Sequence, residues 1–218
     1  LMKRRPSAQR SPTAADTALF NGAGSGNTIL DLGGSGSPRP VLVVRFDSVG
    51  VAAYVLGNAP GDGDAFDLNG STFDVTATVV APQTINADLR SQGTLTVTNN
   101  GAGGLGFYGA LVQGGGSAGT LTFNGAGTTT YAGAIGTGAA GLTKQDAGTL
   151  ILSGTNTYAG TTSVSAGTLR VANGSALGAT GAGNATTVAP GATLEFFGGA
   201  AVGAEPVSVT GAGVGGNG

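Results

Sequence analysis

The chain has 218 residues, of which 44 are glycine, and only 9% are charged whereas 40% are apolar. It contains neither cysteine nor histidine, which excludes thiolate and imidazole metal sites, a cysteine nucleophile and a serine–histidine–aspartate triad. Glycine shows no strict third-position period, so the chain is not collagen-like, and the apolar content is too high for ordinary disorder. This composition favours a structural repeat protein.

The start of the chain is basic. Four of the nine positive charges lie there, at Lys3, Arg4, Arg5 and Arg10, and eleven negative but only five positive residues follow. Because a nucleic-acid binder needs a basic face along the phosphates, we expect no nucleic-acid partner. Residues 6–15 are polar, so the basic start lacks the apolar region of a signal peptide, and an export signal is expected outside this sequence. We expect residues 1–40 to form a loosely structured N-terminal segment and a first coil.

The apolar runs that come next are short. The longest are residues 41–44 and 51–56, which suit strands and fall far below the ~18 apolar residues of a membrane-spanning helix. The sequence therefore predicts no transmembrane segment.

Residues 61–70 hold three closely spaced aspartates, Asp62, Asp64 and Asp67. Carboxylates in such a cluster could bind Ca²⁺, which takes six to eight oxygen ligands. The pattern departs from an EF-hand loop because Phe66 stands at a ligand position and no glutamate closes the loop, and it also departs from the nonapeptide calcium repeat. We interpret residues 61–70 as a solvated loop between two strands, assign no metal ligand, and keep calcium binding as the minor alternative.

Beyond this loop, apolar and polar residues alternate with the period of two that is typical of strands. A short Thr-Leu pattern recurs, with its threonines at Thr94, Thr120, Thr149, Thr168 and Thr193. The leucines of successive copies are 26, 29, 19 and 25 residues apart, which is too irregular for hairpins of fixed length. In each copy the leucine and the apolar residue two positions later share a face, so that like side chains can stack on like.

Asn-Gly pairs and other small residues separate these strands. Asn-Gly occurs six times, and it tolerates the positive φ angles of a two-residue hairpin and equally those of a tight corner in a solenoid. Because the chain has no tryptophan and few aromatic residues for the core of a sandwich, we favour the solenoid. The prediction is an all-β, parallel β-helix (β-solenoid) of eight or nine coils, with residues 41–218 as its repeat domain.

Residues 141–171 carry the most specific signature. They contain Leu-Thr-Lys, Gly-Thr-Leu, Ser-Gly-Thr-Asn-Thr-Tyr, Gly-Thr-Thr and a second Gly-Thr-Leu, in that order. This run resembles the passenger-associated strand repeat of bacterial autotransporter proteins, and residues 119–133 hold a weaker echo of it. The resemblance implies a right-handed parallel β-helix that is displayed at, or secreted from, a bacterial surface.

Passengers of this family usually continue into a C-terminal membrane anchor, and the sequence contains none. Residues 210–218 lie within a glycine-rich coil. We therefore expect a fragment of a longer passenger, or a family member that is exported by another route. The last coil leaves an unpaired strand edge, which allows edge-to-edge self-association.

Some parallel β-helices cleave polysaccharides, which requires paired carboxylates, or Ca²⁺ with a basic residue, on one face. Outside the acidic loop the candidates are Asp74, Asp88 and Arg90. Each is more simply an outward-facing, solubilising residue, and no aromatic groove accompanies them. The sequence therefore predicts no catalytic, metal-binding or cofactor-binding residue.

Thr-x-Thr segments suggest a third function. The threonines of residues 94–98 and 120–122 could form a flat ladder of the kind that binds ice or crystals. We expect this ladder to break at Ile151, Arg170 and Glu195, and threonine is in any case a good strand residue. Ordinary patterning of core and surface is the favoured interpretation.

The sequence as a whole predicts a non-enzymatic structural or adhesive passenger segment, located outside the cell or on the bacterial outer surface. The alternative is a glycan-binding or polysaccharide-cleaving β-helix module. Surface glycans or other cells are the expected partners, and no cofactor is expected.

Overall fold

The strands of the protein form two parallel sheets, A and B. The computed structural model describes residues 17–22, 29–30, 39–113, 119–136, 138 and 140–211. Sheet A contains β1 (Thr17–Phe20), β3 (Arg39–Phe46), β5 (Ala65–Val75), β7 (Asp88–Ser91), β8 (Leu95–Asn99), β10 (Leu111–Gln113), β11 (Thr120–Asn124), β13 (Gly141–Lys144), β15 (Thr161–Val164), β17 (Thr186–Val188) and β19 (Val207–Val209). Sheet B contains β2 (Ile29–Leu30), β4 (Val55–Leu56), β6 (Gln83–Ile85), β9 (Leu105–Phe107), β12 (Thr128–Tyr131), β14 (Thr149–Leu152), β16 (Thr168–Val171) and β18 (Thr193–Phe196).

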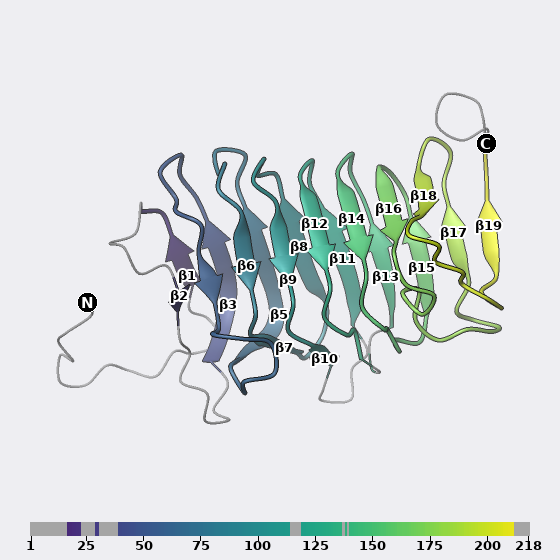
Figure 1. Cartoon of the computed structure of the whole chain (residues 1–218), viewed down its shortest axis with the longest axis horizontal. Coiled ribbons are helices and arrows are strands. Elements are labelled where there is room, and N and C mark those ends of the chain that lie inside the picture. Colours follow the sequence, from purple (N-terminus) through teal and green to yellow (C-terminus); the bar gives the residue numbers. More distant parts are fainter. Residues whose placement is uncertain are drawn as a thin grey trace.

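The chain passes between the two sheets turn after turn, and its strands follow one another along the long axis of the molecule (Figure 1). Strands of successive turns pair in parallel, as β11 does with β8 and β13, and β14 with β12 and β16. The result is an all-β parallel solenoid of about seven turns, which confirms the predicted fold class. Within the described part of the chain there is no helix, and hence none that could span a membrane.

The Thr-Leu copies belong to both sheets. The first two copies form β8 and β11 in sheet A, and the other three form β14, β16 and β18 in sheet B. The interval of 29 residues is therefore the one that passes from sheet A to sheet B, whereas the intervals of 26, 19 and 25 residues separate neighbours within a sheet. Asn100-Gly101 and Asn124-Gly125 follow β8 and β11 at the corners between the sheets, so these pairs turn the solenoid and close no hairpin.

Inward-facing side chains stack in columns between the sheets. One column of sheet B consists of Ile85, Phe107, Tyr131, Leu152 and Val171, which are at most 1% exposed. The rings of Phe107 and Tyr131 stack with their centroids 5.2 Å apart. Phe196 comes next in the column but is 47% exposed, because no further strand of the described residues pairs with β18 on its outer side. Complete burial of one such side chain contributes about 1.5–3 kcal/mol, so the columns are a main source of stability.

Glycine is required where the corners of successive turns approach each other. Gly109, Gly133 and Gly154 form such a column, and a Cβ added at Gly133 would collide with the carbonyl oxygen of Gly109 below it. A Cβ at Gly154 would in turn collide with the carbonyl oxygen of Gly133. Gly127, Gly148 and Gly167 form a second column of the same kind. Much of the high glycine content therefore follows from the stacking of backbone on backbone.

We predict that Gly133→Ala destabilises the protein by about 1–3 kcal/mol, the usual cost of overpacking a tight interior. The new Cβ would collide with the backbone at Gly109, and neither segment can move aside without breaking hydrogen bonds to the neighbouring turns. Gly50→Ala is the matched control, since a Cβ there would meet only the Ser48 hydroxyl, at 3.8 Å. Thermal unfolding followed by circular dichroism measures both variants. A drop of several degrees in Tm is expected for Gly133→Ala and little change for Gly50→Ala; equal melting temperatures for the two would contradict the stacking argument.

Candidate functional site

The acidic segment at residues 61–70 begins with a tight turn that its own carboxylates stabilise. Asp62 accepts hydrogen bonds from the backbone amides of Ala59 at 2.8 Å and Asp64 at 2.9 Å. These bonds, first of all the one from the Asp64 amide, lower the pKa of Asp62. The side chain of Asp64 is buried and accepts a hydrogen bond from the amide of Asn58 at 3.3 Å. Both carboxylates are thus engaged with backbone amides.

The second half of this segment is a strand. β5 begins at Ala65, and Phe66 and Leu68 face inward while Asp67 lies between them on the other face. The interpretation of residues 61–70 as one loop was therefore wrong from Ala65 onward, because the period of two already starts there. Among the described residues, no group of three Asp or Glu side chains is arranged to hold a metal ion.

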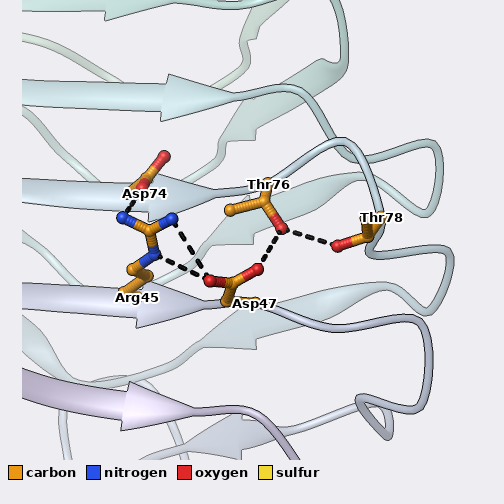
Figure 2. Close-up of polar contacts among 5 residues, drawn as sticks. All are labelled: Arg45, Asp47, Asp74, Thr76 and Thr78. Carbon is orange, nitrogen blue, oxygen red and sulfur yellow. Dashed lines mark hydrogen bonds and ion pairs between the residues drawn. The ribbon is translucent and has the colours of Figure 1, made fainter.

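A polar cluster on the outer face of sheet A joins two turns (Figure 2). The guanidinium of Arg45 contacts the carboxylate of Asp47 at 3.2 Å and that of Asp74 on the next turn at 3.3 Å. The Thr76 hydroxyl donates to Asp47 at 3.1 Å and lies 2.8 Å from the hydroxyl of Thr78. Ion pairs this exposed contribute at most about 1 kcal/mol each, so the cluster mainly aligns β3 with β5.

The residues considered for polysaccharide cleavage do not form one group. Asp74, near the end of β5, is paired with Arg45. Asp88 lies beside Ala65 at the start of β5, more than about 20 Å away along the sheet, and accepts a hydrogen bond from the amide of Ala110 at 2.8 Å. Arg90 is exposed on β7. Asp88 and Arg90 share the outward face of β7, but Asp74 is far from both, and each aspartate makes a structural contact.

Lys144 is a cation inside the solenoid. It is 2% exposed and stands between apolar side chains of the neighbouring turns in an inward column of sheet A. Its ammonium group donates to the backbone carbonyl oxygens of Gln145, Asp146 and Ala166, the last two at 2.7 and 3.4 Å. Burial lowers the pKa of Lys144, and the charge of Asp146 opposes this shift. The side chain therefore ties the corner after β13 to the corner of the next turn.

On sheet A an inward column of leucines, Leu95, Leu121 and Leu142, continues toward the C-terminus with polar residues, Thr162 and Thr186. The hydroxyls of Tyr158 and Thr162 lie 2.6 Å apart, and Thr186, stacked on Thr162, donates to Oε1 of Glu205 at 2.8 Å. Glu205 is 8% exposed, and its Oε2 is buried with no hydrogen-bond partner in the described part of the chain. Burial raises the pKa of Glu205, although the bond from Thr186 opposes the shift.

The outer face of sheet A carries an unbroken column of hydroxyl groups. Its members are Thr72, Thr96, Thr122, Thr143, Ser163, Thr187 and Ser208, each paired in register with the next. The expectation that this ladder breaks at Ile151, Arg170 and Glu195 was wrong. Those three residues form a column on sheet B, and the sequence alone did not show that the strands alternate between two sheets.

A groove on the outer face of sheet B encloses about 310 Å³. It lies over β6, β9 and β12, and Tyr108, which is 44% exposed, forms part of its wall. Gly106 stands between Thr84 and Thr130 in an outward-facing column, so the groove lies where this column lacks a side chain.

The sequence analysis missed this groove, because it considered an aromatic groove only beside Asp74, Asp88 and Arg90, and none of these lines it. The available signal was the alternation of residues 105–108, in which Leu105 and Phe107 face inward while Gly106 and Tyr108 face outward. An exposed tyrosine two residues from a glycine on the same strand face indicates a notch beside an aromatic ring.

We predict that Glu205→Gln is more stable than the wild type at pH 7 and that this advantage shrinks as the pH falls toward 4.5. A carboxyl group whose folded-state pKa is raised contributes stability that is fully present below its unfolded pKa, near 4.5, and is lost as the pH rises through the folded-state value. The amide is neutral throughout.

Urea unfolding at both pH values measures the difference. Glu195→Gln, on the outer face where Glu195 pairs with Arg170, controls for the loss of a surface charge. The same pH dependence in wild type and Glu205→Gln would contradict the prediction.

The comparisons with known proteins point to one region. A family model described as the passenger-associated-transport-repeat matches residues 142–171. No curated protein and no solved structure matches the chain. The matched residues run from β13 to the end of β16 and so supply two strands to each sheet, which amounts to two successive turns. This repeat and the parallel solenoid around it fit an autotransporter passenger repeat protein.

Proposed function

We propose that this protein is a non-enzymatic structural or adhesive segment of a passenger, displayed on the outer surface of a bacterium or released from it. The observation that carries the proposal is the passenger repeat at residues 142–171, which coincides with two successive turns of the solenoid. The matched repeat is thus made of whole turns, as expected where each turn is stabilised by its neighbours.

The stacked turns suit a spacer that extends from a cell. At about 4.8 Å per turn, seven turns give an axial length of roughly 34 Å. We take the solenoid to be right-handed and to reach eight or nine coils in residues 1–218. In this proposal residues 41–218 are the repeat domain of a passenger and the strands β1 and β2 belong to the first coil, whereas the loosely structured segment expected within residues 1–40 falls mostly outside the described residues.

Surface glycans or other cells are the partners that this role implies. Edge-to-edge contact with another passenger is a further part of the proposal. Its physical basis is the row of unpaired backbone groups that the edge strand of any sheet offers to another chain. A non-enzymatic role is supported by the engagement of Asp74 with Arg45 and of Asp88 with a backbone amide.

Protease treatment of intact cells of the native host tests the location. We expect external protease to cleave the protein and release fragments of residues 41–218 to the medium while the cells stay intact. A cytoplasmic protein followed in the same samples is the control for lysis.

Protection of the protein from external protease until the cells are lysed would contradict display. It would leave the solenoid fold untouched and would favour a periplasmic role.

A further inference from the structure

The groove on sheet B has the size and the position of a ligand subsite. Its volume of about 310 Å³ reaches the lower end of the range for small-molecule sites, about 300–1,000 Å³. It lies on the outer face of three successive turns, where the paired strands β6, β9 and β12 provide a rigid floor. A site on paired strands holds its side chains more precisely than a site on a loop.

A missing side chain and an aromatic ring shape the groove. In the outward column, Thr84 and Thr130 flank Gly106 on either side. The ring of Tyr108 folds back along the strand over this glycine, since a Cβ built at Gly106 would lie 2.7 Å from Cε2 of Tyr108. The ring nevertheless stays 44% exposed. An accessible aromatic ring therefore lies over Gly106, between the two threonines.

The chemistry of the lining defines the ligand. Proline, glutamine, threonine, alanine, glycine, leucine and tyrosine line the groove, and none of these carries a charge. A charged ligand would lose water without gaining a counter-ion, and a wholly apolar ligand would leave the hydroxyls of Thr84 and Thr130 without partners. Gln83 is already committed, because its amide bonds to the backbone of Tyr54, Ala52 and Ala81.

A sugar ring matches both parts of this surface. Its C–H face can cover the apolar face of a tyrosine, whose hydroxyl remains free to bond at the edge. Its hydroxyl groups can exchange hydrogen bonds with the threonines and with backbone carbonyls of the floor. We propose that the groove around Gly106 and Tyr108 is a binding subsite for one unit of a neutral saccharide.

Isothermal titration calorimetry on the full 218-residue chain tests the proposal with three neutral probes, cellohexaose, maltohexaose and hexa-N-acetylchitohexaose. We expect at least one to bind, and Tyr108→Ala to weaken that binding tenfold or more. Gly106→Ala is a second, independent variant: the glycine does not have a positive φ, and the nearest atoms to its new Cβ belong to the movable Tyr108 ring. It should keep the fold, displace the ring and weaken binding to a similar degree.

Phe197→Ala is the matched control. Phe197 is 54% exposed and lies outside the groove, against the guanidinium of Arg170, so its loss should leave saccharide binding within twofold of wild type. Circular dichroism confirms that each variant is folded.

Three results would overturn the proposal: no binding of any neutral hexasaccharide at millimolar concentration, binding that survives within twofold in Tyr108→Ala or Gly106→Ala, or tighter binding of hexagalacturonate than of the neutral probes. The subsite deepens the proposed function and rests on it, because it names where a surface glycan would bind. Because the assay uses purified protein, a failure here is distinguishable from a failure of surface display.

Discussion

Hydrogen bonding between successive turns is the interaction on which the rest of this structure depends. Each turn pairs its backbone in parallel with the turn before and the turn after, in both sheets. Pairing persists at the corners, where the amide of Gly148 bonds to the carbonyl of Gly125 at 3.0 Å. Strands at about 4.8 Å leave no room for a side chain between stacked corners, so columns such as Gly109, Gly133 and Gly154 follow directly. Many of the glycines are therefore required because the backbone itself is the packing surface there, whereas others, such as Gly61 and Gly181, have open space beside them and adopt positive φ angles.

This constraint also decides what the surface and the core contain. A residue in register meets its equivalent in the next turn, so apolar residues make continuous columns inside and threonines make a continuous column outside. Few charges are needed, and some of those present bond to an adjacent turn, as Arg45 does with Asp74. Lys144 interrupts an apolar column, and its ammonium group is accommodated because it reaches backbone carbonyls at two successive corners. A gap in an outward column, as at Gly106, opens a groove with fixed walls.

Much of this fold could be predicted from the sequence, because strand periodicity and the stacking of like residues are local patterns. The pairings of Leu95 with Leu121 and of Leu150 with Leu169 follow from them, whereas the pairing of Leu121 with Leu142 does not. The sheet to which each strand belongs could not be predicted, because it depends on the number of residues in each corner. That is why the hydroxyl ladder was expected to break at Ile151, a residue of the other sheet. The groove beside Tyr108 was missed for a related reason: it is built from three turns, and no single strand displays it.

Cysteine cross-linking tests the parallel register most directly, because the natural chain contains no cysteine. Thr122 and Thr143 are paired on adjacent turns, whereas Thr187 lies three turns from Thr122 in the same column. Neighbouring strands at about 4.8 Å fall within the Cα separation that a disulfide spans. The solenoid predicts rapid intramolecular oxidation of the double variant Thr122→Cys/Thr143→Cys in dilute solution, and none for Thr122→Cys/Thr187→Cys. Failure of the first pair to cross-link, or equal cross-linking of both pairs, would contradict the stacked parallel turns.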